Sequence, residues 1–556
     1  MDSASCLLVS RKDATPGGMT RAIVLINSSG ITPGPLGIVE TNPTADAPYR
    51  IARKASAMLR MQQILTLGLS VGSILRTETL CHGIPNDRLS HKIENHPRKR
   101  TSVQYPIQMR FFHACSMCAR RCLSIHECTN CSIAHHSLET NPMTHSEVRA
   151  RVDEVAETYV KLVLAVGQHD SDYVDAYYGP ESWKEEAALT KRPLDDIKKQ
   201  GEKAIDTLRD LATPASEEGV QLRHRYLLRQ LQSLVSCIDL LAGRQMTFDE
   251  ESKALYDAVA PTFAESHFKE ILHQLGNLLP GRGPISDRYH EFQQQFIIPK
   301  ERLDQVFTAA IEESRSRTKK HIVLPDDERF TVEYVTNKSW SGYNWYKGNC
   351  YSVIQMNTDL PIYIDRAVDL ASHEGYPGHH VYNCLLEQHL VLQQKWVEFT
   401  VYALFSPQSL IAEGTANFGI EVAFPSHERV EFERVVLFPL AGMDPLKADL
   451  YYRIHEIFLK LNYAGNEAAR QYLNGTIDRE EAVRLLVEYA LMTPDRAQQR
   501  TRFFDQYRSY VINYNLGQDM VKQYIESRGG TSDNPDRRWT EFRELISSPR
   551  LPSDLR

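Results

Sequence analysis

Long stretches of the chain repeat apolar residues at the spacing of an α-helix. Four segments carry apolar side chains at i, i+3 and i+4, and these are residues 196–211, 220–242, 262–275 and 300–320. Gly201 is the only glycine or proline inside any of them. Because a half-buried strand alternates apolar and polar residues instead, this spacing predicts a mainly α protein.

A helix start is predicted at residue 144. Thr144 and Glu147 have the spacing of a capping box, in which each side chain accepts a hydrogen bond from the other residue's backbone N–H. Apolar residues continue from there at helical spacing, at Val148, Val152, Val155, Tyr159 and Val163. We therefore expect a helical domain over 143–528, followed by a C-terminal tail with a short helix over 529–556.

Residues 1–142 differ in composition from the rest of the chain. They hold 16 Lys and Arg against 9 Asp and Glu, together with seven of the ten cysteines, whereas 143–556 holds 48 against 62. The pairs Cys115-x2-Cys118 and Cys128-x2-Cys131 could supply four thiolates to one zinc ion. The short spacing between the pairs and the lack of periodicity favour a poorly ordered or non-native N-terminal extension instead.

Composition also narrows the class of protein. No stretch reaches the roughly 18 consecutive apolar residues of a membrane span, and the N-terminus lacks the pattern of a secretory signal. The acidic balance of 143–556 argues against a nucleic-acid partner. Cys237, Cys350 and Cys384 are too few for a disulfide framework and fit unpaired thiols in a reducing compartment. We expect a cytoplasmic protein with neither a membrane nor a nucleic-acid partner.

A small β-sheet is predicted within 321–360. The runs HIVL and FTVEYV are β-branched or alternating, and YSVIQMNT is a further extended run. The aromatic segment SWSGYNWYKGN between them is rich in turn residues. The predicted sheet therefore comes immediately before the most unusual segment of the chain.

That segment places three histidines and one glutamate within eight residues, from His373-Glu374 to His379-His380. In the H-E-x-x-H helix of many zinc hydrolases, the second histidine lies about 40° round the helix from the first, so both imidazoles meet one ion. Here the corresponding position is Pro377. Since proline lacks the N–H that would continue the helix, a distortion is expected at this turn.

The distortion decides which histidine can join His373 at an ion. On an ideal helix, His379 would lie about 240° from His373, and His380 would share its face but lie about 10.5 Å along the axis. Gly378 tolerates backbone angles that other residues avoid, so local unwinding can bring His379 back toward His373. The segment is then an H-E-x-x-H motif with two residues inserted before the last histidine.

A third ligand is expected from a separate helix. Glu413 lies in the segment IAEGTANFGIE, whose small residues permit close packing. A carboxylate from this helix would complete a set of two histidines and one glutamate, with a fourth position open for water. Residues one or two helical turns from His373 and Glu413 could orient the ligands, and these are Asp369, Asn417 and Glu421.

Taken together, HEGYPGHH, EGTANFGIE and YVINYNLG resemble the helical metallohydrolase-like family catalogued as domain of unknown function 885. The family pattern is H-E-x-x-P-G-H with a variable next position, then E-G-x-A-x-x-x-E, then a tyrosine-containing stretch ending in glycine. The match spans residues 146–525. It implies a mainly α, gluzincin-like zinc fold, so with the sheet at 321–360 we expect a helical metallohydrolase with a small β-sheet beside the metal helix.

Carried onto this sequence, the family pattern implies zinc ligands at His373, His379 and Glu413 and a general base at Glu374. His380 falls on the variable position, which makes it a pocket residue or an alternative ligand.

The chain departs from the family pattern at two positions. Thr415 stands where the family usually has a large aromatic residue. Ile420 stands where its second glutamate should be, and Glu421 comes one residue late. These departures imply a wider pocket and weaken the carry-over of a role to Glu421.

The predicted mechanism is amide hydrolysis by a metal-activated water. Zinc lowers the pKa of a bound water and polarises the substrate carbonyl, while Glu374 moves the proton from water to the leaving amine. A tyrosine hydroxyl is expected to stabilise the developing oxyanion, with Tyr514 preferred over the other candidates. The other candidates are Tyr510, Tyr343 and Tyr346. In related zinc peptidases a strand before the metal helix pairs with the substrate backbone, and residues 352–358 occupy that place.

Three functions are compatible with these residues. The first is a zinc-dependent peptidase, and the second is a zinc hydrolase of a non-peptide amide or small acyl conjugate. The third is a zinc-binding protein without turnover, against which the intact Glu374 speaks, because such a protein has no need of a base.

Overall fold

The computed structural model describes residues 7–10, 22–25, 144–211 and 218–556. The chain divides into two units, Met1–Cys131 and Ser132–Arg556. The described part of the first unit is an antiparallel pair of strands, β1 (Leu7–Ser10) and β2 (Ala22–Leu25). The predicted N-terminal extension and the alternative zinc module at its cysteines lie otherwise outside the described residues.

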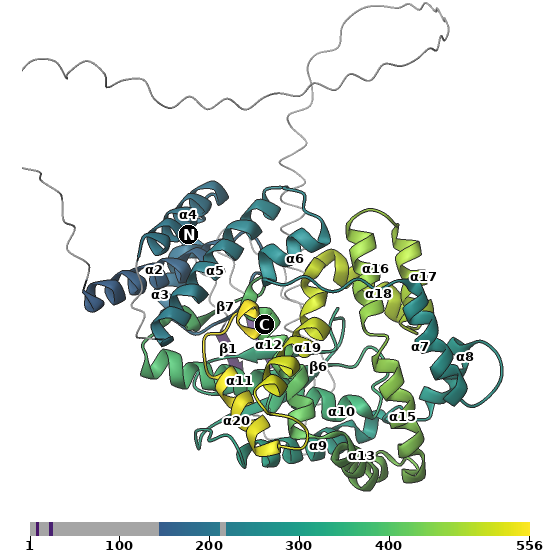
Figure 1. Ribbon diagram of the computed structural model, residues 1–556. Helices are drawn as coiled ribbons and strands as arrows, with labels where there is room; N and C mark the ends of the chain where they lie inside the picture. Colours follow the sequence, from purple (N-terminus) through teal and green to yellow (C-terminus); the bar gives the residue numbers. More distant parts are fainter. Residues whose placement is uncertain (1–6, 11–21, 26–143, 212–217) are drawn as a thin grey trace, which may run out of the picture. The chain divides into compact units, whose positions relative to one another are not determined.

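The second unit is mainly α, which confirms the predicted fold class (Figure 1). Its first helices are α2 (His145–Val166), α3 (Glu181–Thr190), α4 (Leu194–Asp210), α5 (Glu218–Leu241), α6 (Phe248–Tyr256), α7 (Glu265–Leu278), α8 (Ile285–Gln294), α9 (Leu303–Lys319) and α10 (Asp365–Leu370). The later ones are α11 (His379–Leu386), α12 (Pro407–Ala423), α13 (Ser426–Phe432), α14 (Phe438–Ala441), α15 (Ala448–Leu459), α16 (Tyr463–Leu473), α17 (Arg479–Tyr489), α18 (Pro494–Tyr507), α19 (Ile512–Ser527) and α20 (Pro535–Ile546).

The four periodic segments correspond to α4, α5, α7 and α9. The predicted capping box begins α2: Thr144 Oγ1 accepts from the Glu147 N–H, and the Glu147 carboxylate accepts from the Thr144 N–H. The apolar residues at helical spacing after it are buried, as expected for a core-facing stripe.

The predicted small sheet has three strands, in the order β4-β6-β5. β4 (Arg329–Val335) pairs parallel with the central strand β6 (Tyr351–Asn357), and β5 (Gly342–Tyr346) pairs antiparallel with it. Two details of the prediction were wrong. HIVL is not a strand, and the aromatic segment expected as a turn contains β5, because Tyr343, Trp345 and Tyr346 favour a pleated conformation. A separate antiparallel pair joins β3 (Val174–Tyr177) to β7 (Val401–Ala403).

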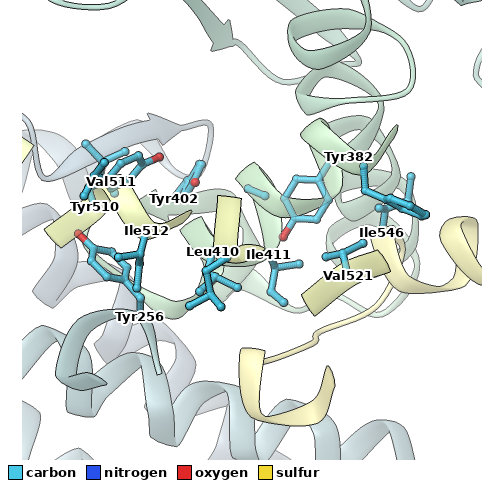
Figure 2. Packing of buried hydrophobic residues seen from close by; sticks show 14 of the residues in the cluster. Tyr256, Tyr382, Tyr402, Leu410, Ile411, Tyr510, Val511, Ile512, Val521 and Ile546 are labelled. Carbon is cyan, nitrogen blue, oxygen red and sulfur yellow. The ribbon is translucent and has the colours of Figure 1, made fainter. Parts of the chain in front are cut away.

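Helices α12 and α19 cross closely at the centre of this unit. A Cβ added to Gly414 of α12 would lie 2.5 Å from the backbone of Gly517 of α19, so only glycine allows this approach. Figure 2 shows the buried packing beside the crossing, with Leu410 of α12 and Ile512 and Val521 of α19. The small residues expected around Glu413 thus allow its helix to pack closely.

Residues 529–556, expected as a tail with a short helix, contain one α-helix, and this helix packs into the core. Helix α20 buries Trp539, Phe542, Leu545 and Ile546 in the same core. A Cβ added to Gly419 of α12 would lie 3.2 Å from the Phe542 ring, so α20 packs against α12. The turn residues at 529–535 dominate the sequence signal, whereas the apolar spacing that follows them makes the buried face of α20.

The cysteine prediction was wrong. Cys350 and Cys384 form a disulfide, and the remaining cysteine of the second unit, Cys237, is buried and free. The paired residues lie 34 positions apart and meet because the turn between β5 and β6 packs against α11. Since disulfides persist mainly in oxidising compartments, cysteine usage no longer supports a cytoplasmic protein.

Within the described ranges, none of the helices combines the length and the hydropathy of a membrane span.

Candidate metal centre

The segment that carries the motif is an interrupted helix. After α10 the chain continues as a π-helical turn, η2 (Ala371–Gly375), and α11 then starts at His379. Across the interruption the Tyr376 N–H donates to the Ala371 carbonyl and the Gly378 N–H donates to the Ser372 carbonyl. Pro377 has no N–H to continue the helical ladder, so the expected distortion occurs at this turn. Such π-turns are frequent at functional sites.

Gly378 is required by a close backbone approach. A Cβ at this position would lie 1.9 Å from the carbonyl oxygen of His373, a distance that no side chain tolerates. The chain therefore folds back on itself at Gly378, and this brings the start of α11 beside η2.

Two imidazoles and one carboxylate converge as a result. His373 Nε2 lies 3.1 Å from His379 Nε2, and Glu413 Oε2 of α12 lies 3.3 Å from the first and 3.7 Å from the second. Ligand atoms of His373, Glu374 and His379 also lie within 4.8 Å of one another. We call His373, Glu374, His379 and Glu413 the cavity cluster.

Asn417 fixes the orientation and the tautomer of His373. The Asn417 Nδ2 donates to the Tyr514 carbonyl, so its Oδ1 faces His373 Nδ1 at 2.9 Å and accepts the proton there. A neutral His373 then presents the lone pair of Nε2 to the cluster. A metal-ligating histidine needs this arrangement, with its other ring nitrogen held by a hydrogen bond.

Glu413 is held from one side and left without a partner on the other. Tyr510 donates to Glu413 Oε1 at 2.7 Å, whereas the buried Oε2 has no hydrogen-bond donor among the residues that the structure describes. Burial alone would raise the pKa of this carboxyl, but the imidazoles of His379 and His373 outweigh it and hold the pKa well below its usual value. An orphaned carboxylate oxygen facing two Nε2 atoms fits a divalent cation such as zinc.

Glu374 is buried, and its carboxylate makes no hydrogen bond to any described residue. Its backbone carbonyl accepts from Asn344 Nδ2 of β5, and a Cβ added to Gly342 would lie 2.6 Å from Glu374 Oε1. Burial raises the pKa of Glu374 to about 7, with nearby Glu413 and Asp175 acting in the same direction and His379 opposing them.

His380 lies in a different polar group from His379. Its Nδ1 is 2.8 Å from Ser352 Oγ of β6, and its Nε2 is 3.4 Å from Glu328 Oε1. Glu328 also accepts from Tyr376 and Arg315. We call Glu328, Ser352, Tyr376 and His380 the sheet cluster. His380 is thus directed toward the buried side chains of Ser352 and Glu328 and is not brought together with His373. The break at Gly378 turns His379, rather than His380, toward η2.

Two residues expected to orient the ligands bind elsewhere. Asp369 pairs with Arg429 at 2.9 Å and with Arg366 at 3.2 Å, and it makes no hydrogen bond to any imidazole of the described ranges. Glu421 pairs with Lys522 at 2.8 Å and accepts from Gln518. Helical spacing puts both on the correct helices, but arginine and lysine side chains from neighbouring helices reach them first.

The candidate tyrosines separate by the partners of their hydroxyl groups. Tyr510 donates to Glu413, Tyr343 donates to Asp175, and Tyr346 donates to Glu387. The Tyr514 hydroxyl makes no hydrogen bond to the described residues, and its side chain lines the same cavity as the cavity cluster.

The strand expected to pair with substrate is placed differently. Residues 352–358 fall mostly within β6, whose two edges are already paired with β4 and β5. β5 is an outer strand of this described sheet, and its Gly342 lies next to Glu374.

The cavity cluster lies in the wall of a cavity of about 640 Å³. The charged lining residues that the sequence did not indicate include Asp175 of β3 and Arg496 and Arg500 of α18. Burial raises the pKa of Asp175 to about 6. These residues belong to elements far from the motif in sequence, and nothing in their local pattern marks them.

No family model and no curated protein matches the chain. Among solved structures it is similar to the putative lipoprotein from Colwellia psychrerythraea, at 15% identity and a TM-score of 0.41, over 74% of this chain and 75% of that one. It is also similar to Pyrococcus furiosus carboxypeptidase, at 12% identity and a TM-score of 0.40, over 74% and 94%. The M32 carboxypeptidase from Deinococcus radiodurans R1 gives 12% and 0.33, also over 74% and 94%. Chemistry does not follow from structural similarity at this level.

Proposed function

We propose that this protein is a zinc-dependent hydrolase of amide bonds whose substrates are peptides. The observation that carries the proposal is the convergence of His373 Nε2, His379 Nε2 and Glu413 Oε2, no two of them more than 3.7 Å apart, in a cavity wall. Two imidazoles and one carboxylate are a ligand set of catalytic zinc sites, which keep a fourth position open. The sequence resemblance to the domain of unknown function 885 family supports the same interpretation.

Zinc held by these residues supplies Lewis acidity and lowers the pKa of a water toward 7. Glu374 takes a proton from the attacking water and passes it to the leaving nitrogen. Its carboxylate is free for this work because it makes no hydrogen bond to the described residues. Tyr514 donates to the oxygen of the carbonyl under attack, since its hydroxyl is also free. Tyr510 is a positioning residue that holds Glu413.

An extended peptide can bind along β5. β5 is an outer strand of the described sheet, its Gly342 lies next to Glu374, and its residues 342–344 line the cavity. Backbone hydrogen bonds to an edge strand give affinity without requiring a particular side chain. This supports a peptide over a small amide as the substrate, although a non-peptide amide or acyl conjugate would use the same residues.

The test is metal analysis together with a search for products. The full chain is loaded with zinc and incubated with a mixed peptide library and with a panel of small amides, and products are identified by mass spectrometry. We expect about one zinc per chain and cleavage of peptides. Cleavage of small amides alone would replace the substrate class, and stoichiometric zinc with no cleavage in either panel would favour a zinc-binding protein without turnover.

A further inference from the structure

Two arginines of α18 line the cavity without a carboxylate partner. Arg496 and Arg500 lie four residues apart, so they share one face of the helix. Among the described residues, no carboxylate oxygen lies within 4.0 Å of either guanidinium group. Arg496 donates to the Pro361 carbonyl at 2.8 Å, whereas Arg500 makes no hydrogen bond to the described residues, and its Nε is buried.

The other arginines of the same cavity provide a comparison. Arg429 pairs with Asp369 and with Glu433, and Arg366 also pairs with Asp369. The protein therefore neutralises its cavity arginines where the cavity is built from α10 and α13. On the α18 wall it leaves two positive charges uncompensated.

Aromatic rings hold Arg500 in position. Its guanidinium carbon lies 4.5 Å from the centre of the Phe503 ring and 5.9 Å from that of Tyr514. The faces of these aromatic rings attract a cation and restrict the orientation of the planar guanidinium group, but they supply no hydrogen-bond acceptor. Burial lowers the pKa of Arg500, which reflects the cost of an unpaired charge in this wall. A bound anion would relieve that cost and accept the unused N–H groups.

Arg500 lies close to the cavity cluster. The Tyr514 ring in contact with Arg500 packs against the Tyr510 ring, with centres 5.8 Å apart, and the Tyr510 hydroxyl binds Glu413. An anion on Arg500 therefore lies in the same cavity as the metal ligands, separated from them by tyrosine side chains.

We propose that Arg500, assisted by Arg496, binds a carboxylate of the substrate and so sets which amide bond reaches the metal centre. The guanidinium fork matches a carboxylate in a bidentate arrangement. This inference rests on the proposed function, since it assigns a specificity residue to the same cavity. The carboxylate comes from the C-terminus of a peptide or from an acidic side chain, and both present the same chemistry to Arg500.

The first test measures binding and does not need turnover. The probes are 3-phenylpropionate and its neutral amide, titrated calorimetrically into the zinc-loaded full chain. The variants are Arg500→Gln and, as a matched control, Arg502→Gln, since Arg502 lies on the exposed side of the same helix. We expect the acid to bind the wild type and Arg502→Gln, and to bind Arg500→Gln roughly ten- to a hundredfold more weakly. The amide should show no such difference.

Other outcomes overturn the proposal. One such outcome is equal affinity of the acid for the wild type and for Arg500→Gln. Another is binding of the acid that is lost when zinc is chelated but is retained in Arg500→Gln. Absence of acid binding to the wild type would also overturn it. Arg500→Lys keeps the charge, so partial recovery of binding would show that the loss in Arg500→Gln is not a folding defect.

The second test separates the two sources of the carboxylate. A peptide that the wild type cleaves is compared with its C-terminally amidated form and with a form in which each Glu or Asp is replaced by its amide. Loss of kcat/KM on amidation alone assigns the C-terminal carboxylate, and loss on side-chain replacement alone assigns the acidic side chain. Equal cleavage of all three forms contradicts the inference. If no peptide is cleaved, the proposed function fails while the binding test still decides the role of Arg500.

Discussion

Glu374 and Glu328 are two buried carboxylates in neighbouring clusters, yet their pKa values move in opposite directions. Glu328 of the sheet cluster is 2% exposed, and Glu374 of the cavity cluster is 4% exposed. Burial would raise the pKa of both. At Glu328, the nearby imidazole of His380 and hydrogen bonds from Arg315 and Tyr376 outweigh it and lower the pKa to about 2. Glu374 has no such donors among the described residues, and its pKa rises to about 7.

The comparison shows that hydrogen-bond partners, and not burial, distinguish a carboxylate that stabilises the fold from one that is available to a ligand. The sheet cluster supplies the Glu328 carboxylate with donors from Arg315 and Tyr376, so it stabilises the fold. Within the part of the chain that the structure describes, the cavity cluster leaves Glu413 Oε2 without a donor, and no hydrogen bond reaches the Glu374 carboxylate. These oxygens are therefore available to a ligand. Adjacent residues of one helix, His379 and His380, belong to the two different clusters.

The largest effect is expected from replacing Glu374 and Glu328 in turn by glutamine, which changes each carboxylate to its amide. Glu374→Gln should keep about one zinc per chain. A proton-transfer group typically contributes roughly 10²–10⁴-fold to turnover, and the loss should reach or exceed the top of that range, because Glu374 acts on both the water and the leaving nitrogen. The matched Glu328→Gln should keep turnover within about tenfold and lose about 1–3 kcal/mol of stability. Metal analysis, kcat on a library-derived peptide and denaturant unfolding measure the three quantities. A Glu374→Gln enzyme within tenfold of wild type would remove the base from the mechanism.

The second comparison replaces His379 and His380 in turn by alanine. His379→Ala should weaken zinc binding by more than the roughly 10–100-fold that is typical of groups that only orient a ligand. His380→Ala should keep stoichiometric zinc after dialysis but lower the unfolding midpoint, because Glu328 loses a partner. Retention of zinc in His379→Ala with loss in His380→Ala would mean that the two clusters have exchanged roles.

The third comparison concerns residues that were both expected to orient ligands. Asn417→Ala removes the acceptor that fixes the His373 tautomer, so zinc affinity should fall by roughly 10–100-fold. Asp369→Asn should leave zinc affinity unchanged, because Asp369 binds Arg429 and Arg366 and no imidazole. Competition with a chelator of known affinity measures both. An equal fall in the two variants would show that Asp369 acts on the metal through the arginines.

The sequence predicted those parts of the molecule that depend on local spacing. Helical periodicity and the capping box at Thr144 gave the mainly α fold and the start of α2. The Pro377-Gly378 step indicated that the helix breaks and that His379, rather than His380, returns to His373, which the 3.1 Å distance reproduces.

The remaining features depend on contacts between distant segments. The order of the strands, the Cys350–Cys384 disulfide and the arginine partners of Asp369 are decided by which elements pack together. Arg500 approaches the cavity through the packing of α18, so no local pattern identifies it. The hydrogen-bond partners that distinguish the two clusters are also determined by the fold and not by the motif.

The smallest effect is expected at Tyr510, where the question is whether its hydroxyl serves the ligand or the substrate. In this structure it donates to Glu413 Oε1, while Oε2 faces the imidazoles. Once zinc shares the charge of Glu413, that hydrogen bond should count as an ordinary one, of about 0.5–1.5 kcal/mol. Tyr510→Phe should therefore weaken zinc binding by only about two- to tenfold and leave kcat at saturating zinc nearly unchanged. A donor to the oxyanion would behave in the opposite way, with zinc affinity unchanged and kcat reduced by roughly 10²–10³-fold. Measuring both quantities on one variant decides between the roles, and the oxyanion result would move Tyr510 from the support of a ligand to the reacting carbonyl.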